Sequence, residues 1–388
     1  MNREKKEIPL IFFPYEQKVN SIYNETFSFL KSNYNFIYAP SKISQLTKLK
    51  NNLLIRDSYY FLINVLRKLG LKSKNKEIIF PKESLLFCFN QLPPEGYNFI
   101  LDLEIVIGLS KYDYHKLNKE YLKSRLESKY CKSILCWNNS SYQSLVNLID
   151  CSNFKNKIKI IPFGRKSSKF IKKENKNINL LFVSSVNNPK DFETKGGILA
   201  LEVYSQLAKK FNNLKFYIRA NVPKSIEKKY KNIPGIIFLK KYLSQKEMNS
   251  LLKNSDILLE PVPGISLMLE CMDYKIVPVS FDYWCIKDMI FNKKSGFLID
   301  SSSIFGKSYN DLYFKNLKDN YDKLYDLEIL KKFIQEYVLK LEKLIYDKKL
   351  KKKMGNYQKG LLVSGPFQPE RRNLKLKKII DSILDNFK

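Results

Sequence analysis

The chain has 388 residues, of which 44% are hydrophobic, so it is long enough for two ordinary domains with full cores rather than disorder. Its 69 Lys and Arg residues outnumber its 38 Asp and Glu residues, which gives a formal net charge of +31. No apolar run approaches the roughly 20 residues of a membrane-spanning helix, and the first residues lack the apolar segment of a signal peptide, so we expect a cytoplasmic protein.

The first half of the chain alternates short apolar runs with amphipathic stretches. The predicted strands are residues 8–13, 35–38, 77–80, 85–89, 99–104, 133–137 and 157–161. The predicted helices are residues 19–32, 59–69, 118–129 and 140–148. This alternation is typical of a parallel sheet that is covered by helices.

A polar, lysine-rich stretch at 166–177 separates this half from a second one, in which the alternation starts again. The predicted strands there are residues 179–184, 214–219, 236–239, 257–260, 275–279 and 296–299. The predicted helices are residues 197–211, 225–230, 244–253, 266–272 and 282–291. A long charged helix at 311–353 is expected to break at Gly355, Gly360 and Gly365, and a last amphipathic helix covers 369–387.

Two starts of the same pattern predict two α/β domains. We place the first at residues 1–165, the linker at 166–177, the second domain at 178–360 and a terminal segment at 361–388. Ligands of parallel sheets bind beyond the carboxyl ends of the strands. A cleft between two such domains suits a reaction of two substrates.

The positive charge narrows the choice of partner. No helix-turn-helix, zinc-finger or aromatic RNA-binding motif is present, so we do not expect nucleic acid. Charge spread along the chain suits an anionic membrane surface, with the inner face of the membrane as a further location. The richness in Lys, Asn, Ile and Tyr is also typical of an AT-rich genome, and this alternative stays open.

The cysteines and the single histidine argue against a metal site. The six cysteines form no Cys-x-x-Cys pair, and we expect buried, reduced thiols. His115 is expected to face solvent. No Asp-x-Asp metal motif is present either, so we expect neither a metal nor a cofactor.

Lys195 follows the first predicted strand of the second half and precedes a helix. A cation beside a helix N-terminus can hold a diphosphate, because the unpaired amides and the helix dipole add to its charge. Gly196 and Gly197 would let the backbone approach a ligand closely. The alternative is a solvated surface lysine.

Arg219 ends the predicted strand 214–219. A charged residue at the carboxyl end of a buried strand points into the crevice, where Arg can bind a phosphate with two hydrogen bonds. An ordinary surface ion pair is the alternative.

Glu270 lies in an otherwise apolar helix start, where a carboxylate needs a partner. It could accept hydrogen bonds from both ribose hydroxyls of a nucleotide, or it could simply be favoured by the helix dipole. The amides of Gly264, Ile265 and Ser266 could bind phosphate or sugar oxygens.

Asp102 and Glu104 lie at the carboxyl end of the predicted strand 99–104 in the first half. We expect them to face the cleft, where they could orient an acceptor hydroxyl or take its proton as catalytic residues. A solvated strand end is the alternative.

Residues 178–300 resemble the donor-binding half of retaining GT-B glycosyltransferases of the large family 4. The matching segments are Leu181-Phe-Val-Ser-Ser185, Lys195-Gly196, Phe238-Leu239, Asn254-Ser-Asp-Ile-Leu-Leu-Glu-Pro261, Leu269-Glu-Cys-Met272, Pro278-Val279 and Ser295-Gly-Phe-Leu298. Weaker matches outside this half are Asn20-Ser-Ile-Tyr23, Cys131-Lys132, Ile160-Ile-Pro-Phe-Gly164 and Phe367-Gln-Pro-Glu-Arg-Arg372.

The resemblance implies two facing Rossmann-like domains, of which the first binds the acceptor and the second the nucleotide-sugar donor, and a C-terminal helix that crosses back to the first. It implies a retaining, metal-independent transfer to a glycan or lipid-linked hydroxyl in cell-surface polysaccharide or glycolipid synthesis. By the same resemblance Lys195 contacts the donor diphosphate, Glu270 the ribose, and Ser184 and Ser185 belong to the donor site.

The chain departs from the family pattern at several positions. Val262 stands where the family has the first glutamate of an E-x7-E motif, and Ile105 stands where a histidine is common. The usual basic residue near Ser185 is missing, and Arg219 is a candidate replacement. A non-catalytic GT-B protein that binds nucleotide or partner enzymes, and a nucleotide-sugar epimerase, therefore remain as alternatives.

Overall fold

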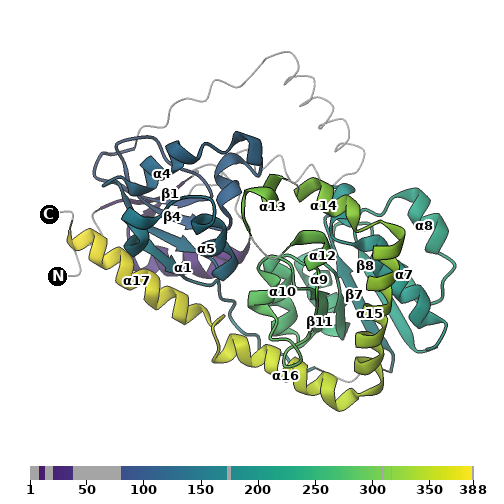
Figure 1. The fold of residues 1–388 in the computed structure, drawn as a ribbon. Helices are drawn as coiled ribbons and strands as arrows, with labels where there is room; N and C mark the ends of the chain where they lie inside the picture. Colours follow the sequence, from purple (N-terminus) through teal and green to yellow (C-terminus); the bar gives the residue numbers. More distant parts are fainter. Residues whose placement is uncertain are drawn as a thin grey trace.

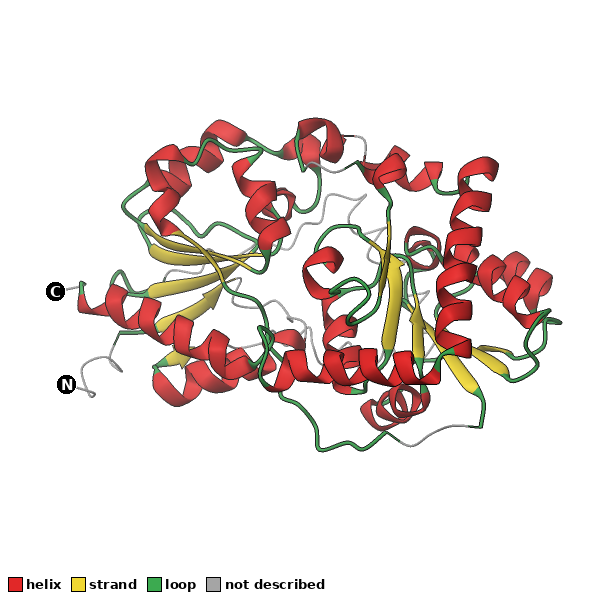
Figure 2. Ribbon diagram, turned by 60° about the horizontal axis from the view of Figure 1, so that its bottom comes forward, coloured by secondary structure: helices red, strands yellow, loops and turns green. Residues whose placement is uncertain are grey.

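The computed structural model describes residues 8–13, 21–37, 80–172, 176–306, 309–315 and 317–386. Within these residues the chain forms two parallel six-stranded sheets, one in each half of the molecule, with helices packed on their faces (Figures 1 and 2). The two-domain α/β architecture predicted from the alternation is confirmed.

The first sheet has the strand order β2-β1-β3-β4-β5-β6. Its strands are β1 (Leu10–Phe13), β2 (Phe36–Ile37), β3 (Leu85–Phe89), β4 (Asn98–Leu103), β5 (Cys131–Cys136) and β6 (Ile158–Ile160). Its helices are α1 (Asn24–Asn33), α4 (Lys119–Glu127) and α5 (Asn139–Val146), with short 3-10 helices at Ser21–Tyr23, Val106–Ser110, Tyr114–Lys116 and Ser152–Lys157. The predicted helix at 59–69 and most of the predicted strand at 77–80 lie outside the described residues.

The second sheet has the order β12-β11-β10-β7-β8-β9. Its strands are β7 (Ile178–Val183), β8 (Leu214–Arg219), β9 (Ile236–Phe238), β10 (Ile257–Leu259), β11 (Val277–Phe281) and β12 (Phe297–Ile299). The helices that follow them are α6 (Lys190–Thr194), α7 (Gly197–Ala208), α8 (Lys224–Tyr230), α9 (Gln245–Asn254), α10 (Ile265–Asp273), α11 (Ile286–Met289) and α12 (Ser302–Phe305). The strands predicted in this half agree with the structure to within two residues at either end.

The prediction of one helix over 282–291 is wrong, because only α11 is helical there. The Asp282 carboxylate instead accepts hydrogen bonds from the amide and hydroxyl of Ser301, both at 2.8 Å. Trp284 then takes a left-handed backbone conformation with φ of 47°. The segment is therefore a bonded turn before it becomes a helix.

The single helix predicted over 311–353 is also wrong. The described residues form α13 (Asp311–Lys315), α14 (Leu317–Lys323), α15 (Leu327–Tyr346) and α16 (Lys348–Val363). Asp326 and Asp347 begin α15 and α16, since each carboxylate accepts a hydrogen bond from an amide of the first turn.

Helix α16 continues through Gly355 and Gly360, where a break was expected. At Gly355 a Cβ atom would lie 2.8 Å from the Lys275 carbonyl oxygen, so glycine here allows close packing of the helix against the loop before β11. The helix ends only at Val363. The expected boundary at 360/361 thus falls inside α16, and the crossing segment starts near Ser364.

Helix α17 (Pro369–Asp385) leaves the second domain and packs along α1 of the first (Figure 1). The Tyr34 hydroxyl of the first domain donates to Asp381 of α17 at 3.1 Å. The two chain crossings between the domains touch each other: the Arg165 amide donates to the Phe367 carbonyl at 3.1 Å. The predicted crossing helix is confirmed.

The exposure of the cysteines and of the single histidine agrees with the predictions. All six cysteines are buried and free, as expected, and His115 is exposed. Among the described residues no helix is long and apolar enough to cross a membrane.

Candidate functional site

Polar side chains gather beyond the carboxyl ends of three neighbouring strands of the second sheet. Ser184 follows β7, Arg219 ends β8 and Glu260 follows β10. These strands lie side by side in the order β10-β7-β8, so their ends meet at one edge of the sheet. This is the edge at which parallel α/β sheets bind their ligands.

Lys195 is not a solvated surface lysine. Its Nζ donates to Glu260 Oε1 at 3.0 Å, and its side chain is 27% exposed. Glu260 is fully buried, and its Oε2 accepts the Val183 amide at 3.1 Å. Burial raises the pKa of Glu260, while Lys195 acts against this shift. The ion pair with Glu260 holds the Lys195 ammonium group at the strand edge, and part of the lysine side chain stays exposed.

Gly196 begins α7 in the left-handed region, with φ of 80°. A Cβ atom there would lie 2.6 Å from the Pro261 side chain. The glycine is therefore required by the protein's own packing, which brings the α6–α7 turn against the segment after β10. It holds Lys195 next to Glu260.

Two buried polar atoms at the same edge lack a hydrogen-bond partner among the described residues: Ser184 Oγ and Arg219 Nε. Arg219 Nη1 donates to the Ser184 carbonyl at 2.8 Å, so the two side chains belong to one cluster. Burial lowers the pKa of Arg219. Because unsatisfied buried donors are costly, this geometry is typical of a site that receives a polar ligand. Ser185 next to them bonds locally, with its Oγ accepting the Asn187 amide at 3.1 Å.

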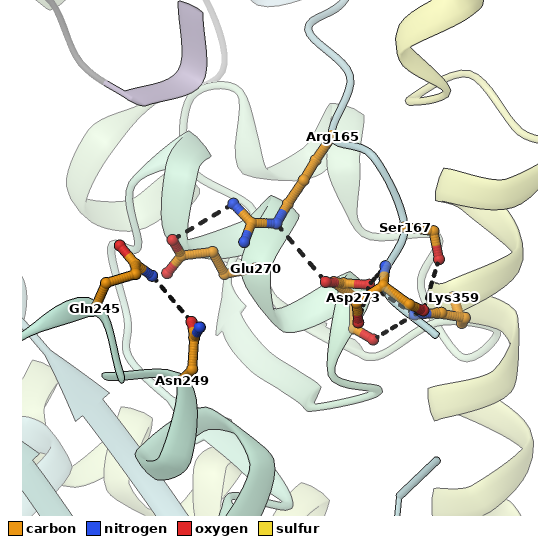
Figure 3. Close-up of polar contacts among 8 residues, drawn as sticks. Arg165, Ser167, Gln245, Asn249, Glu270, Asp273 and Lys359 are labelled. Atoms are coloured by element: carbon orange, nitrogen blue, oxygen red, sulfur yellow. Dashed lines mark hydrogen bonds and ion pairs between the residues drawn. The ribbon is translucent and has the colours of Figure 1, made fainter. Parts of the chain in front are cut away.

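Glu270 lies on α10, where its Oε1 is 3.6 Å from Arg165 Nη1 (Figure 3). The Glu270 side chain is only 15% exposed. Burial raises the pKa of this carboxyl, and Arg165 acts in the opposite direction. On its other side the Arg165 guanidinium lies 3.9 Å from Asp273, which Lys359 binds at 2.6 Å.

A cavity of about 380 Å³ opens in front of Glu270. It is lined from the second domain by α9 and α10, from the connection between the domains by residues 164–166, and from the first domain by residues of the α1 region. The lining residues are Ile22, Asn24, Glu25, Gly164, Arg165, Lys166, Gln245, Asn249, Ser266, Leu269 and Glu270. Both domains therefore contribute to the wall beside the predicted ribose-binding carboxylate.

The start of α10 is open. Gly264 precedes the helix without a side-chain cap, and a Cβ atom there would meet nothing within 4 Å. Ser266 lines the Glu270 cavity, and Ile265 lines a second interdomain cavity of about 260 Å³. The uncapped amides of this turn are thus placed where a ligand could accept from them.

Asp102 does not face the cleft, so the expectation is wrong for this residue. It is fully buried, and its carboxylate binds Arg372 of α17 at 3.0 Å and the Tyr23 hydroxyl at 2.7 Å. Side chains alternate along a strand, and the face on which Asp102 lies is covered by α1 and α17. Its role is to hold the crossing helix.

Glu104 remains available. Its Oε2 accepts the Tyr112 hydroxyl at 2.7 Å and the Asn90 amide at 3.1 Å. Burial raises the pKa of Glu104. The Ser141 hydroxyl donates to the Glu104 carbonyl, and Ser140 beside it donates to Asp288 of the second domain. This carboxylate therefore lies on the side of the first domain that faces the second.

The domains also bond directly across their interface. The amide and hydroxyl of Ser140, at the start of α5, donate to Asp288 of α11 at 2.9 and 2.8 Å. A carboxylate from the second domain thus occupies the N-terminus of a helix of the first.

Arg165, Gln245 and Asn249 were not predicted as site residues. Arg165 follows the Pro162-Phe-Gly164 break, and its charge directly before the linker is the one signal that could have drawn attention to it. Gln245 and Asn249 bond to each other at 2.9 Å from one face of α9, and polar residues one helical turn apart carry no such signal.

No family model and no curated protein matches the chain. Solved structures match it in fold. HepE of Anabaena, in complex with UDP and glucose, has a TM-score of 0.58 over 97% of this chain and 100% of its own, at 10% identity. WaaG, a glycosyltransferase involved in lipopolysaccharide biosynthesis, has a TM-score of 0.57 over 96% and 99%, at 12% identity.

The chain has the GT-B fold. The pneumococcal O-GlcNAc transferase GtfA, in complex with UDP and GlcNAc, matches with a TM-score of 0.55 and 16% identity over 84% of this chain. The chain spans only 60% of GtfA and 56% of TarM, which are longer proteins.

Neither Val262 nor Glu260 supplies the carboxylate that the family resemblance implies at position 262. Val262 is half-buried against the hydrophobic core. Glu260, two residues earlier, is enclosed and bound to Lys195, so its carboxylate has no surface left for a sugar.

Proposed function

We propose that this protein is a glycosyltransferase that moves a sugar from a nucleotide-sugar donor to a hydroxyl of a glycan or lipid-linked acceptor. The observation that carries the proposal is the pair of unpartnered buried atoms, Ser184 Oγ and Arg219 Nε, at the strand edge beside Lys195. In HepE and GtfA, which share the fold, the bound molecules are UDP and a sugar.

The donor diphosphate would lie between Lys195 and Arg219. Charge develops on this group as the glycosidic bond to it breaks, and fixed cations stabilise that charge most strongly where water is excluded. Lys195 is held in place by Glu260, and Arg219 by the Ser184 carbonyl, so neither has to reorganise. Ser184, Ser185 and the amides of Gly264 to Ser266 would complete the donor site.

The ribose would bind at Glu270. Its carboxylate can accept from two hydroxyls in the plane of the group, and it lines the cavity of about 380 Å³. The Arg165 guanidinium, 3.6 Å away, favours the charged form of the carboxylate and limits its orientation. The second domain, 178–360, would therefore bind the donor and the first domain, 1–165, the acceptor.

On the acceptor side we assign Glu104 the role of orienting the hydroxyl or accepting its proton. Burial raises its pKa toward the range in which a carboxylate is an effective base, while Tyr112 and Asn90 keep it oriented. Retention of configuration and independence of metal follow from the family resemblance. The net charge of +31 supports an acceptor at the inner face of an anionic membrane, in cell-surface polysaccharide or glycolipid synthesis.

The test is turnover with a panel of nucleotide sugars, including UDP-glucose, UDP-N-acetylglucosamine and GDP-mannose, with nucleotide release and product mass as readouts. We expect one donor to be hydrolysed slowly and transferred faster when a lipid-linked acceptor is added. Binding of a donor without turnover, across acceptors, would favour the non-catalytic reading that Val262 supports. Interconversion of sugar epimers without nucleotide release would identify an epimerase instead.

A further inference from the structure

A second cluster of charge lies at the opposite edge of the second sheet. Its residues come just before strands begin: Ile178 opens β7, Asn213 precedes β8, Asp256 precedes β10 and Lys275 precedes β11. The donor site lies at the carboxyl ends of the same strands. The two places are therefore separated by the length of the sheet.

A cavity of about 180 Å³ forms at this edge. Its lining residues are Lys172, Lys176, Asn177, Ile178, Asn213, Asp256, Lys275, Lys348, Lys351, Lys352, Gly355 and Asn356. Half of these twelve residues are lysines, whereas Lys and Arg together make up 69 of the 388 residues of the chain. A lysine-rich sequence alone therefore does not account for the cluster, which we call the lysine pocket.

Helix α16 supplies three of these lysines from one face. Lys348, Lys351 and Lys352 are spaced three and four residues apart, so their side chains lie next to one another. They belong to the first two turns of a 16-residue helix, whose N-terminus is capped by the Asp347 carboxylate. The close packing of Gly355 against Lys275 brings this helix end to the strand edge.

Among the described lining residues, lysines outnumber acidic residues. Asp256 is the one acidic lining residue, and Lys172 Nζ lies 3.5 Å from it and also donates to the Ser255 carbonyl. Lys275 is bonded to the neutral Asn356 at 2.8 Å. Burial lowers the pKa of Lys172, and Asp256 acts against this shift. Six ammonium groups around one small cavity attract a multiply charged anion.

We infer that the lysine pocket binds a ligand with two or more phosphate groups, at a site separate from the donor cavity. Lysine ammonium groups suit phosphate as point charges without demanding one fixed geometry. The volume of about 180 Å³ admits a short phosphate chain or a phosphorylated head group rather than a whole nucleotide sugar. The same chemistry can come from a soluble polyphosphate or from an anionic lipid.

The test uses the full-length protein and inorganic tripolyphosphate as ligand, measured by isothermal titration calorimetry at about 0.1 M salt, where charges more than about 10 Å apart are largely screened. The pocket variant is Lys348→Glu with Lys352→Glu. The matched control is Lys349→Glu with Lys353→Glu, which has the same spacing and charge change on exposed positions of the same helix outside the pocket lining.

We expect the pocket variant to bind tripolyphosphate at least tenfold more weakly than wild type and the control to change less than threefold. Equal weakening in both variants would show only diffuse attraction and would overturn the proposal, as would no binding by wild type. Neither variant touches the donor cavity, so tripolyphosphate binding there would leave all three proteins alike, which also contradicts the proposal.

Flotation with phosphatidylcholine vesicles that contain phosphatidylglycerol distinguishes the source of the phosphate. Loss of flotation in the pocket variant alone would identify a lipid head group. Equal flotation of the three proteins, together with selective loss of tripolyphosphate binding, would identify a soluble anion. Because donor turnover is a separate assay, failure here leaves the proposed transferase activity untouched.

Discussion

Arg372 of the crossing helix α17 and Asp102 of the central strand β4 form an ion pair that is fully enclosed, with Nη2 3.0 Å from Oδ2. The rest of the guanidinium is also occupied: Nη1 donates to the Ile161 carbonyl at 2.6 Å, and the group stacks on the Phe163 ring at 3.8 Å. One side chain therefore ties α17, the first sheet and the segment that leads into the linker.

We expect Arg372→Ala to destabilise the first domain by about 3–5 kcal/mol, because it leaves the Asp102 charge buried without its partner. Urea unfolding followed by tryptophan fluorescence measures this, since Trp137 lies in the same domain beside Phe163. The control is Arg371→Ala at the exposed neighbouring position, for which we expect less than about 1 kcal/mol. Equal effects of the two changes would contradict the assigned role.

Lys195→Ala should reduce both stability and donor binding, and a second substitution separates the two effects. Removal of the ammonium group leaves Glu260 buried without a cationic partner, which raises its pKa further. When a buried carboxyl has a raised pKa, the folded protein loses stability as pH increases through that pKa. The deficit relative to wild type should therefore be larger at pH 8 than at pH 5, measured by thermal unfolding.

The double variant Lys195→Ala with Glu260→Gln removes that unpaired charge. We expect it to recover most of the stability but none of the donor affinity, measured by calorimetry with the donor found active. Recovery of both would mean that Lys195 serves the fold only.

Glu270→Gln should weaken donor binding by roughly tenfold to a hundredfold at neutral pH, since hydrogen bonds to a charged group contribute about 1.5–3 kcal/mol. In wild type, burial raises the pKa of Glu270 above its ordinary value of 4.5. Donor affinity should therefore fall as pH is lowered through that raised pKa, when the carboxyl becomes protonated. The fall should be absent in Glu270→Gln and present in Glu328→Gln, a change at an exposed position of α15.

Gly196→Ala should destabilise the second domain by at least about 1–2 kcal/mol, because the left-handed conformation is costly for any residue with a Cβ atom. The new atom would also lie 2.6 Å from Pro261. Gly360→Ala is the comparison, as this helical position is open within 4 Å, and there alanine should stabilise by roughly 0.5–1 kcal/mol. Opposite signs in thermal unfolding are the expected result.

The sequence predicted the two-sheet architecture because that architecture depends on local patterns. Strands such as β7 and β8 are short apolar runs, and their order along the chain fixes parallel pairing. The positions of Lys195 and Arg219 could be predicted for the same reason, since one precedes a helix and the other ends a strand, whereas Glu270 lies within α10 and is placed by resemblance.

What the sequence did not reveal depends on contacts between distant segments. Asp102 reads as a strand-end acid until α17, some 270 residues later, supplies its partner Arg372. Glu260 follows an apolar strand in the sequence, and only the structure shows that Lys195 binds it. Arg165 lies opposite Glu270 because the connection between the domains passes beside α10. The sequence pattern places a side chain at the edge of a sheet, but it does not identify the charged residue that binds it there.

The two chain crossings between the domains have a mechanical consequence. A domain on one flexible tether can swing and twist about any axis. Here the outgoing segment is bonded to the returning one by the Arg165 amide and the Phe367 carbonyl, and a Cβ atom at Gly164 would lie 2.5 Å from Pro369. Such a paired connection restricts the relative rotation of the domains more than a single tether does, and a distance between two labels across the cleft would measure the motion that remains.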